Sequence, residues 1–160
     1  KNHNMKPNIG ISDENLKNAT KILNSELSNE TVLYIKTRKF HWNISGNSFM
    51  ELHLLFEAQY KEMEEIIDEV AERINKLGSK TIGTMQEFID NATLKEAPGK
   101  YPSQKEMITE LLQDHEQLIT EIRKAVEEDE KGLDAGTVDF ITGVMQQHET
   151  IAWKLRRYLN

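Results

Sequence analysis

Two histidines and eight acidic residues lie between residues 41 and 72, where the only basic residue before Arg73 is a single lysine. His53 precedes Glu57 by four residues, and Asp68 precedes Glu72 by the same spacing. On an α-helix, residues four apart share a face, and Glu57 and Asp68 fall about 20° apart around the axis. A run of acids is more often only a solvated helix face. Imidazole and carboxylate groups on one stripe, however, suit iron or another first-row divalent metal.

Distance along the helix prevents these four side chains from binding one ion within one chain. Eleven residues separate Glu57 from Asp68 by about 16 Å, whereas metal–ligand bonds are about 2.0–2.5 Å. An antiparallel copy of the same helix, related by a two-fold axis, would bring the first pair of one chain to the second pair of the other. His41, at the end of the preceding helix, could add a ligand. The sequence has no Glu-x-x-His motif, which disfavours a di-iron centre inside a single bundle.

Four long amphipathic segments and one short segment position these residues. Apolar residues recur at helical spacing, and the low content of Pro, 3 residues, and of aromatic residues, 7%, favours helices over sheets. Ser48, Thr84 and Ser103 are each followed three residues later by Glu, which predicts capping boxes. The pattern predicts an all-α four-helix bundle with a short extra helix in the connection between the second and third helices. The expected helices span residues 12–43, 48–77, 84–92, 103–132 and 137–159.

Charge and composition narrow the classes of function. Residues 1–40 hold 7 basic and 4 acidic side chains, whereas residues 41–160 hold 13 and 23. This acidic body argues against a protein built mainly to clamp nucleic acid phosphates. The absence of Cys excludes disulfide scaffolds and cysteine nucleophiles. No segment approaches the ~18 apolar residues of a membrane span.

The same composition fits a cytoplasmic protein, because a chain without Cys suits a reducing compartment. We expect one domain over residues 12–160, preceded by a tail of residues 1–11. Within that tail, residues 1–4 precede Met5 and are interpreted as foreign to the native chain.

A long and specific motif surrounds the second expected helix. It runs His41-Trp42-Asn43-Ile44-Ser45-Gly46, then Phe49, Leu52-His53, Phe56, Tyr60, Asp68, Ala71-Glu72-Arg73 and Leu77-Gly78. This motif resembles the signature of the Dps family, the mini-ferritins known as DNA-binding proteins from starved cells. The resemblance extends over the whole chain in the order and length of the helices.

The resemblance implies a ferritin-like subunit in a hollow homododecamer, with a di-iron ferroxidase centre at the two-fold interface. His41, His53 and Glu57 would come from one subunit. Asp68 and Glu72 would come from its partner, with Glu72 bridging the two irons. The family often has Asp where this chain has Glu57, so the longer side chain puts the weaker iron position in doubt.

The resemblance also implies roles outside the ligand set. Trp42, beside the first ligand, resembles a family tryptophan proposed to take up stray oxidising equivalents, although packing is the simpler interpretation. Acidic pores at the three-fold axes would be lined by Glu130 and Asp139, with Asp134 as a further candidate.

Other titratable residues receive plain interpretations. His115 and His148 have no acidic partner at metal spacing in the sequence, so we expect structural roles for both. Glu62, Glu65 and Glu69 are expected to lie on a solvated surface.

Two functions from different classes fit these observations. The first is a ferroxidase that oxidises Fe(II), preferentially with hydrogen peroxide, and stores Fe(III) mineral, protecting DNA from oxidative damage. The second is a DNA-compacting nucleoid protein with secondary iron binding. Only Lys1 and Lys6 precede Ser12, so we expect weak or absent DNA binding, with nucleoid association left open. An inert structural bundle is opposed by the self-repulsion of the acidic stripe.

Overall fold

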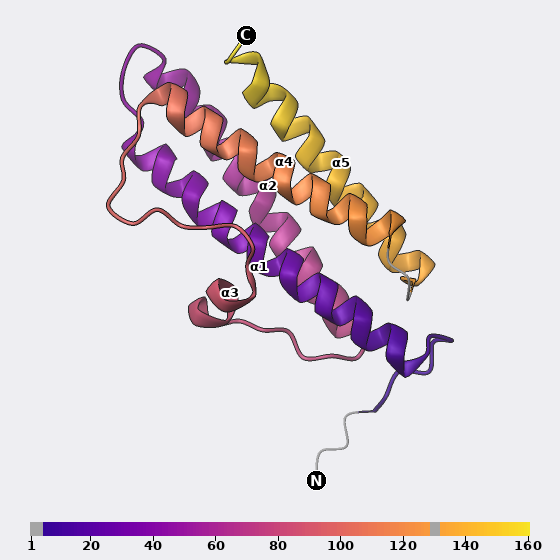
Figure 1. Ribbon diagram of the computed structural model, residues 1–160. Coiled ribbons are helices and arrows are strands. Elements are labelled where there is room, and N and C mark those ends of the chain that lie inside the picture. The colour runs from indigo at the N-terminus through magenta and orange to yellow at the C-terminus, as the bar shows by residue number, and fades with distance from the viewer. Residues whose placement is uncertain (1–4, 129–131) are drawn as a thin grey trace.

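The computed structural model describes residues 5–128 and 132–160, and over these ranges the chain forms five helices and no strand (Figure 1). This confirms the all-α fold with a short extra helix in the second connection. The helices are α1 (Asp13–Asn43), α2 (Phe49–Lys76), α3 (Met85–Asn91), α4 (Gln104–Glu127) and α5 (Ala135–Arg157).

The long helices pack in two pairs. α1 lies against α2, and α4 lies against α5. The connection that carries α3 returns along the length of the bundle, so α2 and α4 run in the same direction (Figure 1). α3 itself packs on α1 and stands outside the four-helix layer.

Local capping determines where the helices begin. The Thr84–Glu87 and Ser103–Glu106 capping boxes are both complete, as the sequence predicts. The capping box predicted at Ser48 is wrong, because the backbone there has φ −102° and ψ 28°, outside the extended region that an N-cap needs, and its side chain makes no cap hydrogen bond.

The boundary of the last helix also differs slightly from its prediction. α5 begins at Ala135, two residues before the predicted start, because the Asp134 side chain caps it by accepting from the Thr137 N–H.

The hydrophobic core is continuous but contains polar residues near its middle. The predicted apolar stripe of α2 lines the core, with Leu52, Phe56, Met63, Val70 and Ile74 all buried. Buried charged or titratable side chains also occur inside the bundle, in contrast to the usual composition of a helical core. They include Glu26, Glu30, His115 and His148.

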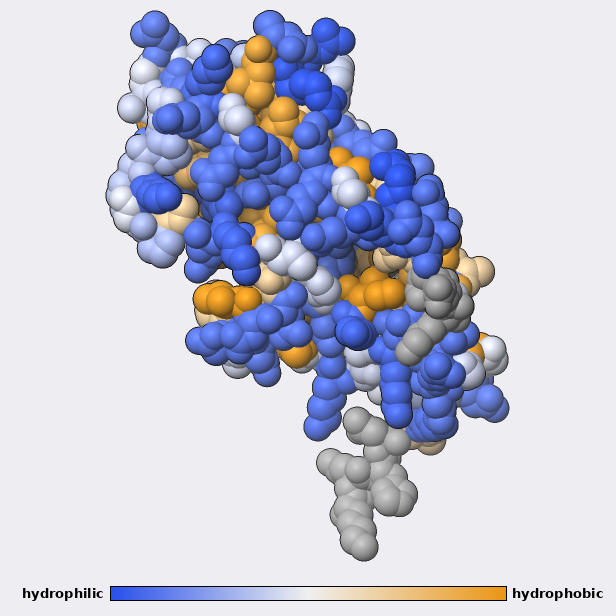
Figure 2. Space-filling model, in the orientation of Figure 1, coloured by the Kyte–Doolittle hydropathy of each residue, from blue (hydrophilic) through white to orange (hydrophobic). Residues whose placement is uncertain are grey.

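The surface is largely hydrophilic, and hydrophobic side chains are exposed over α3 (Figure 2). Met85 and Ile89 of this helix are 65% and 49% exposed. Within the part of the chain that the structure describes, no helix is long and apolar enough to cross a membrane.

Candidate functional site

His41 and His53 hold each other through two reciprocal hydrogen bonds. Nδ1 of His41 lies 2.7 Å from the His53 carbonyl oxygen, and Nδ1 of His53 lies 2.8 Å from the His41 carbonyl oxygen. The rings are stacked, with centroids 3.8 Å apart and planes inclined by 14°. A carbonyl oxygen only accepts, so each Nδ1 is the donor. In the neutral rings both Nε2 lone pairs therefore remain available to a metal, the usual arrangement of metal-binding histidines.

The short turn between α1 and α2 brings these rings together. His41 is in the last turn of α1 and is buried, while His53 is in the second turn of α2 and is half-buried. Tyr60 meets the His41 ring edge-on with centroids 5.2 Å apart, and Phe49 stacks on His53 at the same separation. These aromatic contacts restrict the orientation of both imidazoles.

The carboxylates predicted from the sequence lie further along α2. Glu57 is one turn beyond His53, is 36% exposed and forms an ion pair of 3.7 Å with Lys61. Asp68 and Glu72 are near the other end of the helix, where both are exposed. The five predicted ligands do not gather within one chain, because no group of three among them has ligand atoms within 4.8 Å of one another in the described residues. The interchain arrangement therefore stays a prediction.

Trp42 lies in an exposed stack around an arginine and is not packed into the core. The indole is 62% exposed, and the Arg38 guanidinium carbon lies 5.2 Å from its centroid. Arg38 also lies 4.5 Å from the Tyr60 ring and donates to the Tyr34 hydroxyl at 2.7 Å. The indole is thus not packed within a single chain, and its packing role stays a prediction. Trp42 is connected to the histidine pair through Arg38 and Tyr60.

The predicted pore residues have separate environments. Asp139 is exposed on α5. Asp134 is half-buried and ion-paired with Arg73 at 2.9 Å in addition to capping α5, a structural role that the sequence pattern does not indicate. Glu130 lies outside the described residues.

A second cluster of possible ligands lies inside the bundle. His148 Nε2 contacts Glu30 Oε1, and His148 Nδ1 lies 2.8 Å from His115 Nδ1. Glu26, Glu30 and His148 are all buried and offer ligand atoms within 4.8 Å of one another. The interpretation that His148 lacks an acidic partner is therefore wrong, because the partner comes from another helix, 118 residues away.

Burial alters the proton affinity of every member of this interior cluster. Burial raises the pKa of Glu30 to about 8 and that of Glu26 well above its ordinary value. It lowers the pKa of His148 to about 4 and the pKa of His115 well below its ordinary value, so both rings are neutral at pH 7. The nearby charge of Glu62 further raises the pKa of Glu30. Glu62 is half-buried and is therefore not the plain surface acid that the sequence suggested. Burial thus favours the uncharged form of each group in the cluster.

Comparison with known proteins identifies the family. Residues 20–160 match the family model of the ferritin-like domain. DNA protection during starvation protein 2 of Bacillus anthracis is 34% identical over 145 residues, which cover 90% of this chain and 98% of that protein. The chain belongs to the Dps family of ferritin-like proteins.

Other related proteins agree in sequence and structure. The crystal structure of a Dps protein from Vibrio cholerae O1, described as a member of a broad superfamily of ferritin-like diiron-carboxylate proteins, has a TM-score of 0.89 and 29% identity, covering 98% of both chains. A low temperature-induced protein of Nostoc sp., itself uncharacterized, is 44% identical over 153 residues, which are 95% of this chain and 86% of that relative. The family resemblance found in the sequence is confirmed.

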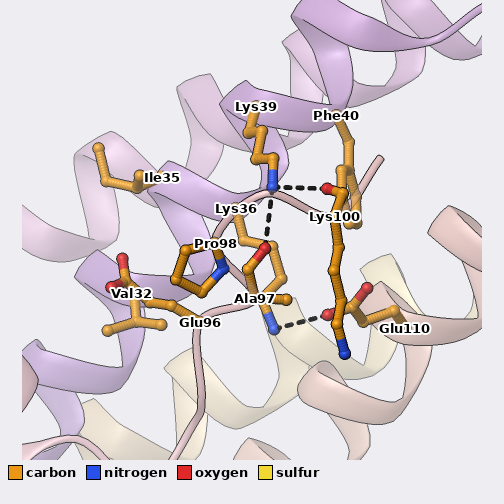
Figure 3. Close-up of a pocket in the computed structure, with 10 residues that line it drawn as sticks. All are labelled: Val32, Ile35, Lys36, Lys39, Phe40, Glu96, Ala97, Pro98, Lys100 and Glu110. Atoms are coloured by element: carbon orange, nitrogen blue, oxygen red, sulfur yellow. Dashed lines mark hydrogen bonds and ion pairs between the residues drawn. The ribbon is translucent and has the colours of Figure 1, made fainter. Parts of the chain in front are cut away.

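A further cavity lies between α1 and the connection that follows α3 in this Dps fold (Figure 3). Its volume is about 140 Å³. Lys39 Nζ donates to the carbonyl oxygens of Ala97 and Lys100 at 3.1 and 2.7 Å, and Lys36 pairs with Glu110 at 3.2 Å. The Lys39 contacts fasten the connection to α1, and the Lys36–Glu110 pair joins α1 to α4. Because both lysines are engaged in them, we assign the cavity no binding role.

Proposed function

We propose that this Dps subunit is a ferroxidase whose active site is completed by a second copy of the chain. The observation that carries the proposal is the reciprocal hydrogen bonding of His41 and His53, which leaves two Nε2 atoms free beside a carboxylate stripe that no single chain can close. Glu57 extends the same half-site. Asp68 and Glu72 of a partner would supply the other half, related by a two-fold axis.

The donor set suits Fe(II) as the substrate. Imidazole and carboxylate ligands bind iron, and the negative carboxylate oxygens stabilise Fe(III) more than Fe(II) by simple electrostatics. Two Fe(II) ions held side by side give one electron each to hydrogen peroxide, which takes up two protons and leaves as two waters. The paired transfer avoids the one-electron step that releases hydroxyl radical. We therefore propose protection of DNA by removal of Fe(II) and peroxide together.

Exposed apolar side chains support contact with a second copy near the half-site. Trp42, Met50 and Leu54 are 62%, 59% and 53% exposed on or beside the helix turns that carry the histidines. Contiguous exposed apolar surface commonly marks an interaction site. A two-fold contact would cover this patch on both subunits at once.

Storage of Fe(III) mineral follows from the assembly that the family resemblance implies. We propose a hollow homododecamer, with Asp139 and Glu130 facing the route by which Fe(II) enters and Asp134 as a further candidate. The exposed carboxylate of Asp139 supports this assignment. Acidic side chains around a narrow entrance would raise the local concentration of Fe(II).

The interchain assignment is tested by mixing two inactive variants. His53→Ala and Asp68→Ala should each abolish fast Fe(II) oxidation with peroxide. When the two proteins are dissociated, mixed in equal amounts and reassembled, each mixed pair contains one complete site and one doubly defective site. Random pairing should then restore about one quarter of the wild-type sites. Stopped-flow absorbance of Fe(III) measures the recovery.

Size measurement on the same samples is the control, and each variant reassembled alone should stay inactive. Intact mixed shells without any recovered activity would contradict a site shared between subunits.

A further inference from the structure

We propose that the interior of the bundle contains a second metal site, in which Glu26, Glu30 and His148 bind one divalent first-row transition-metal ion. This site lies within a single chain and goes beyond the proposed interchain ferroxidase centre. The two sites share no ligand.

The geometry is close to that of a coordination sphere. The three ligand atoms lie within 4.8 Å of one another, and two atoms that bind one ion at about 2.0–2.2 Å lie at most about 4.0–4.4 Å apart. Glu26 and Glu30 are one turn apart on α1, and His148 faces them from α5. A shift of a few tenths of an ångström per side chain would admit the ion.

Unpartnered polar atoms supply a second, independent observation. Oε1 of Glu26 and Oε2 of Glu30 are buried and have no hydrogen-bond partner among the described residues. The two residues are 6% and 0% exposed. Buried polar atoms nearly always have partners. If the cluster were only a hydrogen-bonded network, these carboxylate oxygens would have hydrogen-bond partners. A bound cation would instead contact them directly.

His115 holds His148 in the orientation that metal binding requires. A ring that binds a metal through Nε2 carries its proton on Nδ1 and donates it to a neighbouring acceptor. Nδ1 of His148 lies 2.8 Å from Nδ1 of His115, while Nε2 of His148 faces Glu30. His115 is thus a positioning residue for this site.

A cavity in the side of the bundle reaches Glu26, one of the three proposed ligands. It has a volume of about 150 Å³, lies between α1, α4 and α5, and is lined by both Glu26 and the half-buried Glu121. Glu121 accepts hydrogen bonds from Asn29 and Thr93, which hold its carboxylate in place. The negative charge in the wall of the cavity would attract a cation toward Glu26.

The ligand chemistry selects the class of metal. Two carboxylates balance the charge of a dication, and the imidazole favours Zn²⁺, Fe²⁺, Mn²⁺ or Co²⁺ over Mg²⁺ and Ca²⁺, which prefer oxygen ligands. Co²⁺ is the best probe because its visible absorption reports the number of ligands.

The test uses assembled protein that carries His53→Ala and Asp68→Ala, so that the interchain site is removed. Metal-free protein is titrated with Co²⁺ and desalted, and bound cobalt and the visible spectrum are measured. We expect one tightly bound Co²⁺ per chain. Adding Glu30→Gln should weaken this binding by more than about tenfold, since loss of even an outer partner of a metal ligand costs 10–100-fold. Adding Glu65→Gln, the same substitution at an exposed position of α2, should have no effect.

Two results would overturn the proposal. One is that the background protein, which carries only His53→Ala and Asp68→Ala, retains no Co²⁺ after desalting. The other is that the Glu30→Gln and Glu65→Gln proteins retain equal amounts of Co²⁺. If Glu30→Gln fails to assemble, the site can still be tested by anomalous diffraction from Co²⁺-soaked crystals of the background protein, which needs no further substitution. A peak between Glu30 and His148 is expected, and bound cobalt found only elsewhere would refute the site. The readout is independent of Fe(II) oxidation, so failure of either proposal leaves the other intact.

Discussion

Trp42 lies beside the histidine pair without contacting a predicted ligand position on α2. Its indole is exposed and stacks on Arg38, which in turn stacks on Tyr60 next to His41. Trp42→Phe should keep an aromatic ring over Arg38 but remove a side chain that is easily oxidised. We expect unchanged rates of Fe(II) oxidation and more nicking of plasmid DNA when Fe(II) and peroxide are added together. Equal nicking by both proteins, at equal iron oxidation, would assign Trp42 to assembly alone.

The ligand residues could be predicted from spacing, but their contacts could not. The i,i+4 pairs on α2 are enough to place Glu57, Asp68 and Glu72 on one stripe of the helix. The mutual hydrogen bonds of His41 and His53 depend on the backbone of the turn between α1 and α2, which residue types do not specify. Spacing also identifies ligands only within one helix, so a partner on another helix is invisible to it.

At the scale of helices, capping provides a matched pair of serines. Ser103 accepts from the Glu106 N–H at the start of α4, whereas Ser48 makes no side-chain cap bond at the start of α2. Ser103→Ala should destabilise the first turn of α4 by about 1 kcal/mol, which increases amide hydrogen exchange there about fivefold. Ser48→Ala is the control and should leave exchange in the first turn of α2 unchanged. Equal effects of both substitutions would mean that the capping hydrogen bond contributes nothing.

The reciprocal half of the same cap predicts a dependence on pH. Hydrogen bonds from the backbone N–H and the hydroxyl of Ser103 lower the pKa of Glu106 below its ordinary value of 4.5. Because the folded-state pKa is depressed, the stabilisation is fully present above about pH 4.5 and is lost as the pH falls through the folded-state value. Amide hydrogen exchange in the first turn of α4 should therefore be slower in the wild-type protein than in Glu106→Gln at neutral pH. This difference should disappear in acid. A constant ratio between pH 3 and pH 7 would contradict this coupling.

Helix boundaries were largely predictable because periodicity and caps are local. Thr84 and Ser103 form their boxes where the sequence places them. Ser48 has the same sequence pattern but follows Gly46, whose φ of 109° directs the chain into a tight turn. The pairing of Glu30 with His148 could not be predicted in this way. Glu26 and Glu30 continue the buried stripe of α1, but that stripe does not show which residue they meet. Their partner approaches only when α5 packs against the other helices, and no single helix encodes that approach.

The molecule as a whole carries a formal charge of −7, and some of its basic side chains are held in ion pairs. Lys36 pairs with Asp114 at 2.7 Å, and Arg156 pairs with Glu116 at the same distance. In the proposed dodecamer the summed negative charge should repel a phosphate backbone. We expect metal-free protein to leave DNA unshifted in a gel at physiological salt, yet to protect the same DNA from Fe(II) and peroxide. Tight retardation without metal would make DNA compaction the better function.

The buried acidic residues of α1 affect how an incompletely folded chain associates with other chains. Residues 26–33 of this helix are all buried in the finished fold, and the cluster is completed only by the last helix. A nascent hairpin of α1 and α2 therefore presents two acids within its apolar face. Pairing that face with another incomplete chain would bury those carboxyl groups without an imidazole to receive them, which is unfavourable. We therefore expect these acids to disfavour association between incomplete chains until the C-terminal helix supplies His148.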